Sequence, residues 1–101
     1  MSMTTLKKKE LKIEAMVARL ATLGAMRPGT LSVQYRNPGE RKTPFRQISY
    51  TRKGKSRSEY VRPESLAAIR KEIATYKTFR RLVEEIIDRS LETSRLRHKR
   101  G

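Results

Sequence analysis

The sequence predicts an α+β fold in which an N-terminal helix, a three-stranded antiparallel sheet and a long C-terminal helix follow one another (α-β-β-β-α). Three observations predict it. Apolar residues recur at three- and four-residue steps towards both ends of the chain, which is the period of an amphipathic helix. Apolar and polar residues alternate in the middle, which is the period of a strand. Finally, Lys53 and Gly54 separate two such strand-like runs and are expected to close a hairpin.

The first helix is expected over residues 4–23. Thr4 or Thr5 can cap its start, and Gly24 suits the position after the last turn, where a left-handed residue often ends a helix. An apolar stripe runs along this helix, and we expect it to pack against the rest of the chain and not to bind a partner or a membrane. Its members are Leu6, Ile13, Met16, Val17, Leu20 and Leu23.

The sheet is expected over residues 30–62, with a polar loop at 37–44 that contains two prolines. A two-residue turn at Lys53-Gly54 would pair Arg52 with Lys55, as well as the residues further from the turn. The pairs expected there are Tyr50 with Arg57 and Ile48 with Glu59.

This register gives the two faces of the sheet different chemistry. Ile48, Tyr50 and Val61 share one face, and we expect the helices to pack against it. A slip of one residue would exchange the faces. The other face is rich in hydroxyl groups and contains Gln47, Ser49, Thr51, Ser56, Ser58 and Tyr60.

The last helix is expected over residues 63–93, either unbroken or interrupted near 75–78. Pro63 and Glu64 suit its first turn. Its apolar stripe is longer than the first helix can cover, so a short coiled-coil homodimer is expected at the far end. Residues 94–101 are expected to be a frayed basic tail of a single domain spanning 1–101. The stripe comprises Leu66, Ile69, Ile73, Tyr76, Phe79, Leu82, Val83, Ile86 and Ile87.

The charge indicates the class of partner. The 101 residues include 25 Lys or Arg against 10 Asp or Glu, a formal net charge of +15. The excess is greatest in residues 30–62. Such a charge favours a polyanionic partner, with nucleic acid ahead of an anionic membrane surface or an acidic protein. No apolar run approaches the roughly 20 residues of a membrane span, and no secretory signal is evident. We therefore expect a cytoplasmic location, at the nucleoid if the ligand is DNA.

Catalytic chemistry has little support in the sequence. The chain has no cysteine, which excludes disulfides and thiolate metal sites, and its single histidine, His98, has no other metal ligand around it. The acids of the last helix could act as a general acid–base pair or hold Mg²⁺, but their helical spacing to arginines favours solvated ion pairs. We predict no enzyme, cofactor or metal site. These acids are Glu84, Glu85, Asp88 and Glu92.

The hairpin and its flanks form the predicted nucleic-acid interface. A small sheet fits the duplex major groove, lysines neutralise phosphates and arginines can also bind guanine in a bidentate manner. Tyr50 is expected to pack beside Ile48, whereas Tyr60 is equally suited to sheet packing and to stacking on an unpaired base. The alternative is a hairpin whose charge only confers solubility. The predicted contacts are Arg36, Arg41, Lys42, Arg46, Arg52, Lys53, Lys55, Arg57, Tyr60 and Arg62.

Three functions therefore remain open from the residues. The first is an accessory protein that binds double-stranded DNA through the basic sheet. The second is an RNA-binding subunit of a ribonucleoprotein, in which Tyr60 and the arginines grip structured RNA. The third is an adaptor that binds a protein partner through the apolar stripe of residues 66–87.

Two short segments carry a resemblance to a known family. Arg27-Pro-Gly-Thr-Leu-Ser-Val-Gln-Tyr35, then the basic hairpin, then Tyr60-Val-Arg-Pro-Glu64 and a long helix resemble small prokaryotic proteins whose genes often accompany transposases. The similarity covers about residues 10–92. It implies a mobile-element accessory role or a DNA-associated role, with a transposase as a candidate partner, and it supplies no established activity. Asn37-Pro-Gly-Glu-Arg41 stands where the family has a cysteine-containing loop, so a metal-binding role for that loop is lost here.

Overall fold

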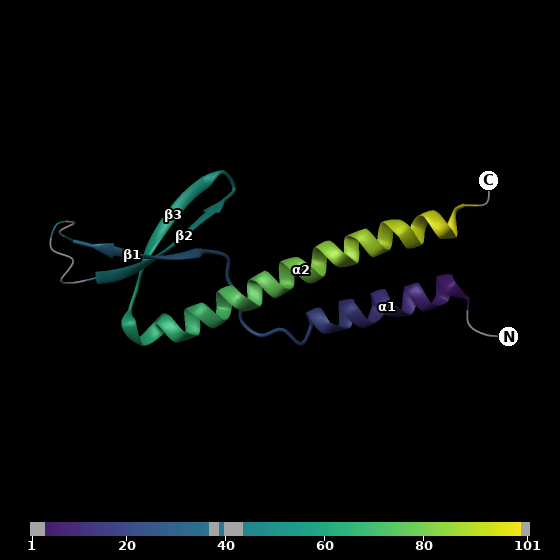
Figure 1. The fold of residues 1–101 in the computed structure, drawn as a ribbon, viewed down its shortest axis with the longest axis horizontal. Helices are drawn as coiled ribbons and strands as arrows, with labels where there is room; N and C mark the ends of the chain where they lie inside the picture. The colour runs from purple at the N-terminus through teal and green to yellow at the C-terminus, as the bar shows by residue number, and fades with distance from the viewer. Residues whose placement is uncertain (1–3, 37–38, 40–43, 100–101) are drawn as a thin grey trace. The chain divides into compact units, whose positions relative to one another are not determined.

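The computed structural model describes residues 4–36, 39 and 44–99. It contains the predicted elements in the predicted order, so the α+β fold is confirmed (Figure 1). The chain divides into two compact units, residues 1–24 with 77–101 and residues 25–76, and α2 contributes to both. The prediction of a single domain stays a prediction. The elements are α1 (Thr5–Leu20), β1 (Thr30–Tyr35), β2 (Pro44–Arg52), β3 (Lys55–Val61), the short 3-10 helix η1 (Pro63–Ser65) and α2 (Leu66–Arg97).

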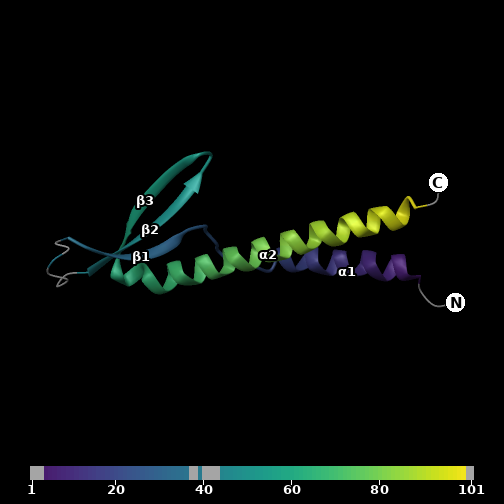
Figure 2. The same cartoon turned by 45° about the horizontal axis from the view of Figure 1, so that its top comes forward.

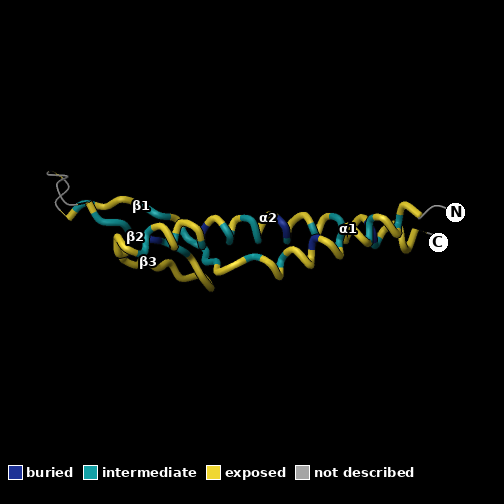
Figure 3. Tube along the Cα trace, turned by 90° about the horizontal axis from the view of Figure 1, so that it is seen from below, coloured by how far each residue is buried: buried dark blue, intermediate teal, exposed yellow. Residues whose placement is uncertain are grey.

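The first unit is a pair of antiparallel helices, α1 and the second half of α2, which lie side by side in Figures 1 and 2. Thr4 caps α1 by accepting a hydrogen bond from the Lys7 backbone N–H at 3.1 Å. Few positions are buried (Figure 3). Met16 and Leu82 are buried, as is Thr93, whose hydroxyl donates to the Arg89 carbonyl at 2.6 Å. That bond satisfies the only buried polar side chain among the described residues of this unit.

Two ion pairs join the helices of this unit near their outer ends. The Lys9 ammonium lies 2.8 Å from the Glu92 carboxylate, and the Arg97 guanidinium lies 3.1 Å from that of Glu10. Early residues of α1 thus meet late residues of α2, as antiparallel packing requires. All four side chains are partly exposed, so these pairs specify alignment more than they add stability.

Both predicted helix ends need correction. α1 ends at Leu20 because the next backbone N–H groups bond three residues back, which tightens the final turn into 3-10 geometry. Gly24 is not left-handed; among the described residues only Lys53 and two other glycines have positive φ. α2 continues without a break to Arg97 instead of fraying after residue 93: Thr93 is buried in this unit, and Arg97 pairs with Glu10 of α1.

The far end of the helical pair keeps apolar side chains exposed. Ile87 and Leu91 are 46% and 52% exposed on α2, and Val17 is 49% exposed on α1. These residues are consistent with the incomplete cover expected from the sequence. The homodimer that was inferred from that stripe stays a prediction.

The second unit is built on an antiparallel sheet with strand order β1-β2-β3. The predicted register of the hairpin is confirmed, with Arg52 opposite Lys55, Tyr50 opposite Arg57 and Ile48 opposite Glu59. The turn residue Lys53 has φ +53° and Gly54 has φ +76°. Positive φ at both central positions is the conformation that matches the twist of a two-residue hairpin.

The core of this unit lies on the predicted face of the sheet. Ile48 is 0% exposed, and with Val61 and Ile73 it forms a buried cluster that joins β2, β3 and α2. Leu31, Leu66 and Ile69 pack around this cluster. Because Ile48 is buried, the neighbouring residues of β2 point to the opposite, uncovered face.

The segment before β1 passes close to this core. Gly29 has φ +147°, and a Cβ atom built there would lie 2.5 Å from both Cγ1 and Cδ1 of Ile48. The Ile48 side chain has no free space to move into because it is fully buried. Glycine is therefore required at this position both for its backbone angle and for its lack of a side chain.

We predict that Gly29→Ala lowers the free energy of unfolding by about 1–3 kcal/mol, through backbone strain and the clash with Ile48. Urea-induced unfolding of the variant and of the unchanged protein measures this difference in the free energy of unfolding. Gly24→Ala is the matched control, since Gly24 has ordinary φ and nothing within 4 Å of its added Cβ. Equal effects of the two substitutions would contradict the prediction.

Candidate nucleic-acid interface

The turn end of the β2–β3 hairpin gathers four of the predicted cations. Arg52, Lys53, Lys55 and Arg57 all have exposed side chains, and this end of the hairpin projects away from the first turns of α2 (Figures 1 and 2). Arg52 lies directly opposite Lys55 in the register. Like charges opposite one another destabilise a strand pair, and a bound anion would remove that repulsion.

The ion pairs of the described residues involve other cations than those of the hairpin end. Within the described parts of the chain, none of the four hairpin cations forms an ion pair, whereas carboxylates bind cations of the helices and of the segment before β1. The fold therefore leaves the positive charge of the hairpin end available to a ligand. The paired cations are Lys9, Arg27, Arg80, Arg89 and Arg97.

The uncovered face of the sheet carries rows of small polar side chains. The hydroxyls of Ser49 and Ser58 lie 3.1 Å apart, and those of Thr51 and Ser56 lie 3.2 Å apart. They border an open hollow of about 570 Å³. Hydroxyl groups can donate to phosphate oxygens or to base edges. The register assigns Arg52, Lys55 and Arg57 to the other face, the one that carries Ile48, so the hydroxyl face is a second polar surface beside the hairpin cations.

A cluster of three side chains braces the middle of the hairpin. The Tyr50 hydroxyl donates to a Glu59 oxygen at 2.6 Å, the Arg27 guanidinium lies 3.5 Å from the other Glu59 oxygen, and it also lies 5.4 Å from the centre of the Tyr50 ring. The hydrogen bond from Tyr50 holds the pKa of Glu59 below its ordinary value, and the same bond raises the pKa of Tyr50. Tyr50 thus has a packing role, as expected.

The remaining predicted contacts are spread over the sheet unit. Arg46 lies on β2 opposite Val61, on the face that carries the core, and Arg62 is the exposed residue before η1. Arg36 follows β1 directly, and Tyr60 lies on the uncovered face with 59% of its surface exposed. Arg41 and Lys42 lie outside the described residues.

Phe45 is a site residue that the sequence analysis missed. Its ring centre lies 6.4 Å from that of Tyr60, with the planes 46° apart, and the Arg36 guanidinium lies 6.0 Å from the Phe45 ring centre. The expected loop ran through residue 44, whereas β2 begins at Pro44. Continuing the alternation of Ser49 and Gln47 back by two residues would have placed Phe45 on the same face as Tyr60.

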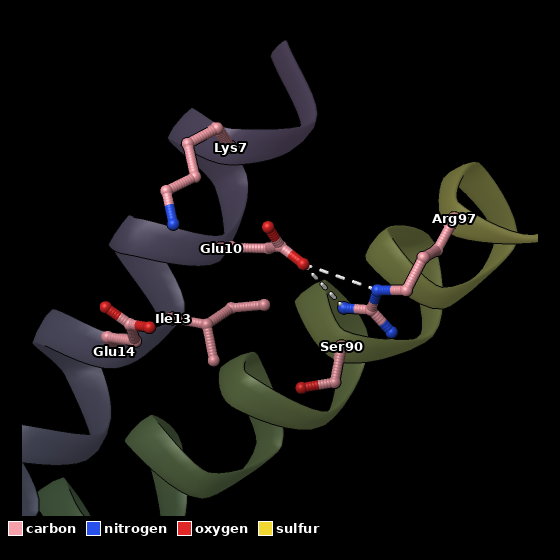
Figure 4. A pocket seen from close by; sticks show the side chains of 6 residues that line it. All are labelled: Lys7, Glu10, Ile13, Glu14, Ser90 and Arg97. Carbon is pink, nitrogen blue, oxygen red and sulfur yellow. Dashed lines mark hydrogen bonds and ion pairs between the residues drawn. The ribbon is translucent and has the colours of Figure 1, made fainter. Parts of the chain in front are cut away.

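The helical unit has a hollow of its own, of about 520 Å³, between α1 and the last turns of α2 (Figure 4). Among its lining residues, Arg97 bonds to Glu10, with Nε and a terminal nitrogen donating to one carboxylate oxygen at 3.3 and 3.1 Å. The charged side chains that line this hollow are of both signs, and two of them, Arg97 and Glu10, already form an ion pair with each other. The lining residues are Lys7, Glu10, Ile13, Glu14, Ser90 and Arg97.

Two of the four acids named on α2 form the ion pairs that their helical spacing predicts. Glu84 pairs with Arg80 at 3.4 Å and Glu85 pairs with Arg89 at 3.1 Å. Glu92 instead pairs with Lys9 of α1, and the hydrogen bond from that ammonium lowers the pKa of Glu92. In the described portions of the chain, His, Asp and Glu side chains nowhere gather in threes that could hold a metal ion.

In comparisons with known proteins, no family model, curated protein or solved structure matches the chain. Among the helices that the structure describes, none is both long and apolar enough to cross a bilayer.

The Tyr50–Glu59 bond generates a pH-dependent prediction. Because the folded-state pKa of Glu59 is lowered, its contribution to stability is present above the ordinary pKa of 4.5 and is lost as the pH falls through the folded-state value. Tyr50→Phe should therefore raise the pKa of Glu59 and flatten the fall in stability below pH 4.5. NMR-monitored titration of the Glu59 carboxyl measures the shift. Tyr60→Phe is the control, and an equal change there would contradict the assignment.

Proposed function

We propose that the chain binds nucleic acid through the basic end of the β2–β3 hairpin, with double-stranded DNA as the preferred form. The observation that carries the proposal is the separation of charge. The carboxylates that form ion pairs in the described parts of the chain bind cations of the helices or Arg27, while Arg52, Lys53, Lys55 and Arg57 stay exposed together at one end of the hairpin and without an ion pair. A row of phosphates is the ligand that such a cluster fits best.

The shape of the hairpin supports a duplex as the ligand. A two-stranded antiparallel ribbon fits the width of the major groove of B-DNA. The projecting turn would enter the groove, with Arg52 and Arg57 near base edges and the lysines near phosphates. The cluster of Arg27, Tyr50 and Glu59 would hold the ribbon at its middle, so that little ordering is needed on binding.

The accessory role in a mobile element rests on the resemblance alone. Its motifs lie in residues 27–35 and 60–64, with the basic hairpin between them and the long helix after them. An association with a transposase is accordingly part of the proposal and would follow only after DNA binding has been established.

A protein adaptor is the second candidate, and one observation favours it. Ile87, Leu91 and Leu96 are exposed on α2. Ile73, which was expected to belong to the binding stripe, is only 8% exposed and packs against the sheet, so a partner cannot reach it. An adaptor would bind nucleic acid no more tightly than its net charge explains. Removing the same number of cations from any part of the chain would then weaken that binding equally.

We predict that replacing Arg52, Lys55 and Arg57 together with glutamine weakens binding to duplex DNA and lowers the salt dependence of log K by about 2.7, since each phosphate contact contributes about 0.9. Lys53 is left in place because its backbone is left-handed and any change there would also alter the turn. Fluorescence anisotropy titrations at several salt concentrations measure both quantities.

The matched control removes the same charge from α1. Lys7, Lys8 and Lys12 are exposed on that helix and form no ion pair with a described carboxylate. Replacing these three with glutamine should leave the salt slope unchanged if the hairpin is the interface. If both triple variants lose the same affinity, binding reflects net charge only and the assignment to the hairpin is wrong.

A further inference from the structure

The uncovered face of the sheet has an aromatic end that duplex binding by the hairpin does not use. Phe45 and Tyr60 are diagonal neighbours there, with Gln34 opposite Phe45 and Gln47 opposite Tyr60. Tyr60 is 59% exposed, the most exposed large hydrophobic residue in the described part of the chain. An aromatic ring that sits this openly on an otherwise hydrophilic face points to a ligand with an aromatic surface of its own.

The geometry of the two rings leaves them available. Their centres are 6.4 Å apart and their planes are inclined by 46°, so the rings touch without covering each other face to face. The Tyr60 hydroxyl has no hydrogen-bond partner among the described residues. The backbone pairing of β2 with β3 fixes both Cα positions, so little ordering is needed when a planar group stacks here.

The charge around the rings selects the class of ligand. Arg36 lies 6.0 Å from the centre of the Phe45 ring and is exposed. The described strand residues on this face include no carboxylate; they are Thr30, Ser32, Gln34, Phe45, Gln47, Ser49, Thr51, Ser56, Ser58 and Tyr60. Aromatic rings beside a cation, amides and hydroxyls match the bases and phosphates of an unpaired strand.

We propose that Phe45 and Tyr60, with Arg36 beside them, form a stacking site for unpaired bases, so that the preferred ligand is a duplex that continues into a single strand. The serine and threonine pairs lie between this site and the hairpin end on the same face, and their hydroxyls would contact the connecting phosphates. This inference names the form of nucleic acid and therefore rests on the proposed function.

The test compares three DNA ligands: a blunt duplex, the same duplex with a single-stranded thymidine overhang, and the same duplex with an abasic overhang of equal length. The abasic overhang keeps the phosphates and removes the bases. We expect the thymidine overhang to bind roughly tenfold more tightly than the other two ligands, because stacking of a base on an aromatic ring is typically worth that much. Equal affinity for the thymidine and abasic overhangs would overturn the stacking site.

Variants at Tyr60 assign the preference to the ring. Tyr60→Ala should remove the preference for the thymidine overhang over the abasic overhang, because it removes the exposed ring and leaves the phosphate contacts of both ligands the same. Tyr60→Phe keeps the ring and should keep the preference. Retention of the full preference by Tyr60→Ala would overturn the proposal.

A fluorescence measurement gives a second readout that does not depend on affinity. The chain has no tryptophan, so Tyr60→Trp introduces a single reporter on the aromatic end. Val33→Trp is the matched control, because Val33 is 47% exposed but belongs to the other face of the sheet. The thymidine overhang should quench the fluorescence of Tyr60→Trp and not that of Val33→Trp. Equal quenching, or none at residue 60, would contradict the stacking site.

The two proposals fail in distinguishable ways. Suppose that the blunt duplex binds, that the salt dependence of its log K falls when the hairpin cations are replaced, and that the thymidine overhang adds no affinity. Then only the stacking site is wrong. If the blunt duplex does not bind but the thymidine overhang binds and quenches Tyr60→Trp, duplex binding by the hairpin is wrong and the stacking site stands.

Discussion

The burial of Ile48 is the constraint on which the sheet unit depends. This side chain has no exposed surface and meets Val61 of β3 and Ile73 of α2. Because side chains alternate along a strand, placing Ile48 inside places Gln47 and Ser49 outside. The same side chain lies so close to Gly29 that the segment entering β1 has room only for glycine. The core therefore determines which side chains of β2 lie on the uncovered face of the sheet.

The small number of acidic residues is a second constraint, because 10 Asp or Glu cannot pair with all 25 Lys or Arg. Carboxylates on α1 and α2 join these helices to each other or brace a single helix, and Glu59 binds Arg27 and Tyr50 in the middle of the hairpin. The cations at the turn receive no such partner among the described residues. They repel one another across the strands, a cost that binding to phosphates would offset. The ion pairs of the described residues therefore brace the helices and the hairpin, and none of them neutralises the cations at the turn.

Much of the fold could be predicted because its signals are local. Lys53-Gly54 determines a two-residue turn, the turn determines the pairs from Arg52–Lys55 to Ile48–Glu59, and those pairs determine the faces. The errors occur where local signals compete with contacts distant in sequence. The end of α2 was placed too early because the partner of Arg97 is Glu10, 87 residues away. Phe45 was missed because a loop with two prolines was expected to end only after Pro44, which in fact begins β2.

The sequence by itself determined the order of the elements, the register of the hairpin and the positive charge at its end, because periodicity, turn conformation and residue counts need no distant contact. Only the tertiary structure decided which cations remain unpaired, since Arg27 could have met a carboxylate on any element and meets Glu59. It also decided that Arg36, Phe45 and Tyr60 form one cluster. These residues come from three different strands or their ends, and the pairing of β1, β2 and β3 brings them together.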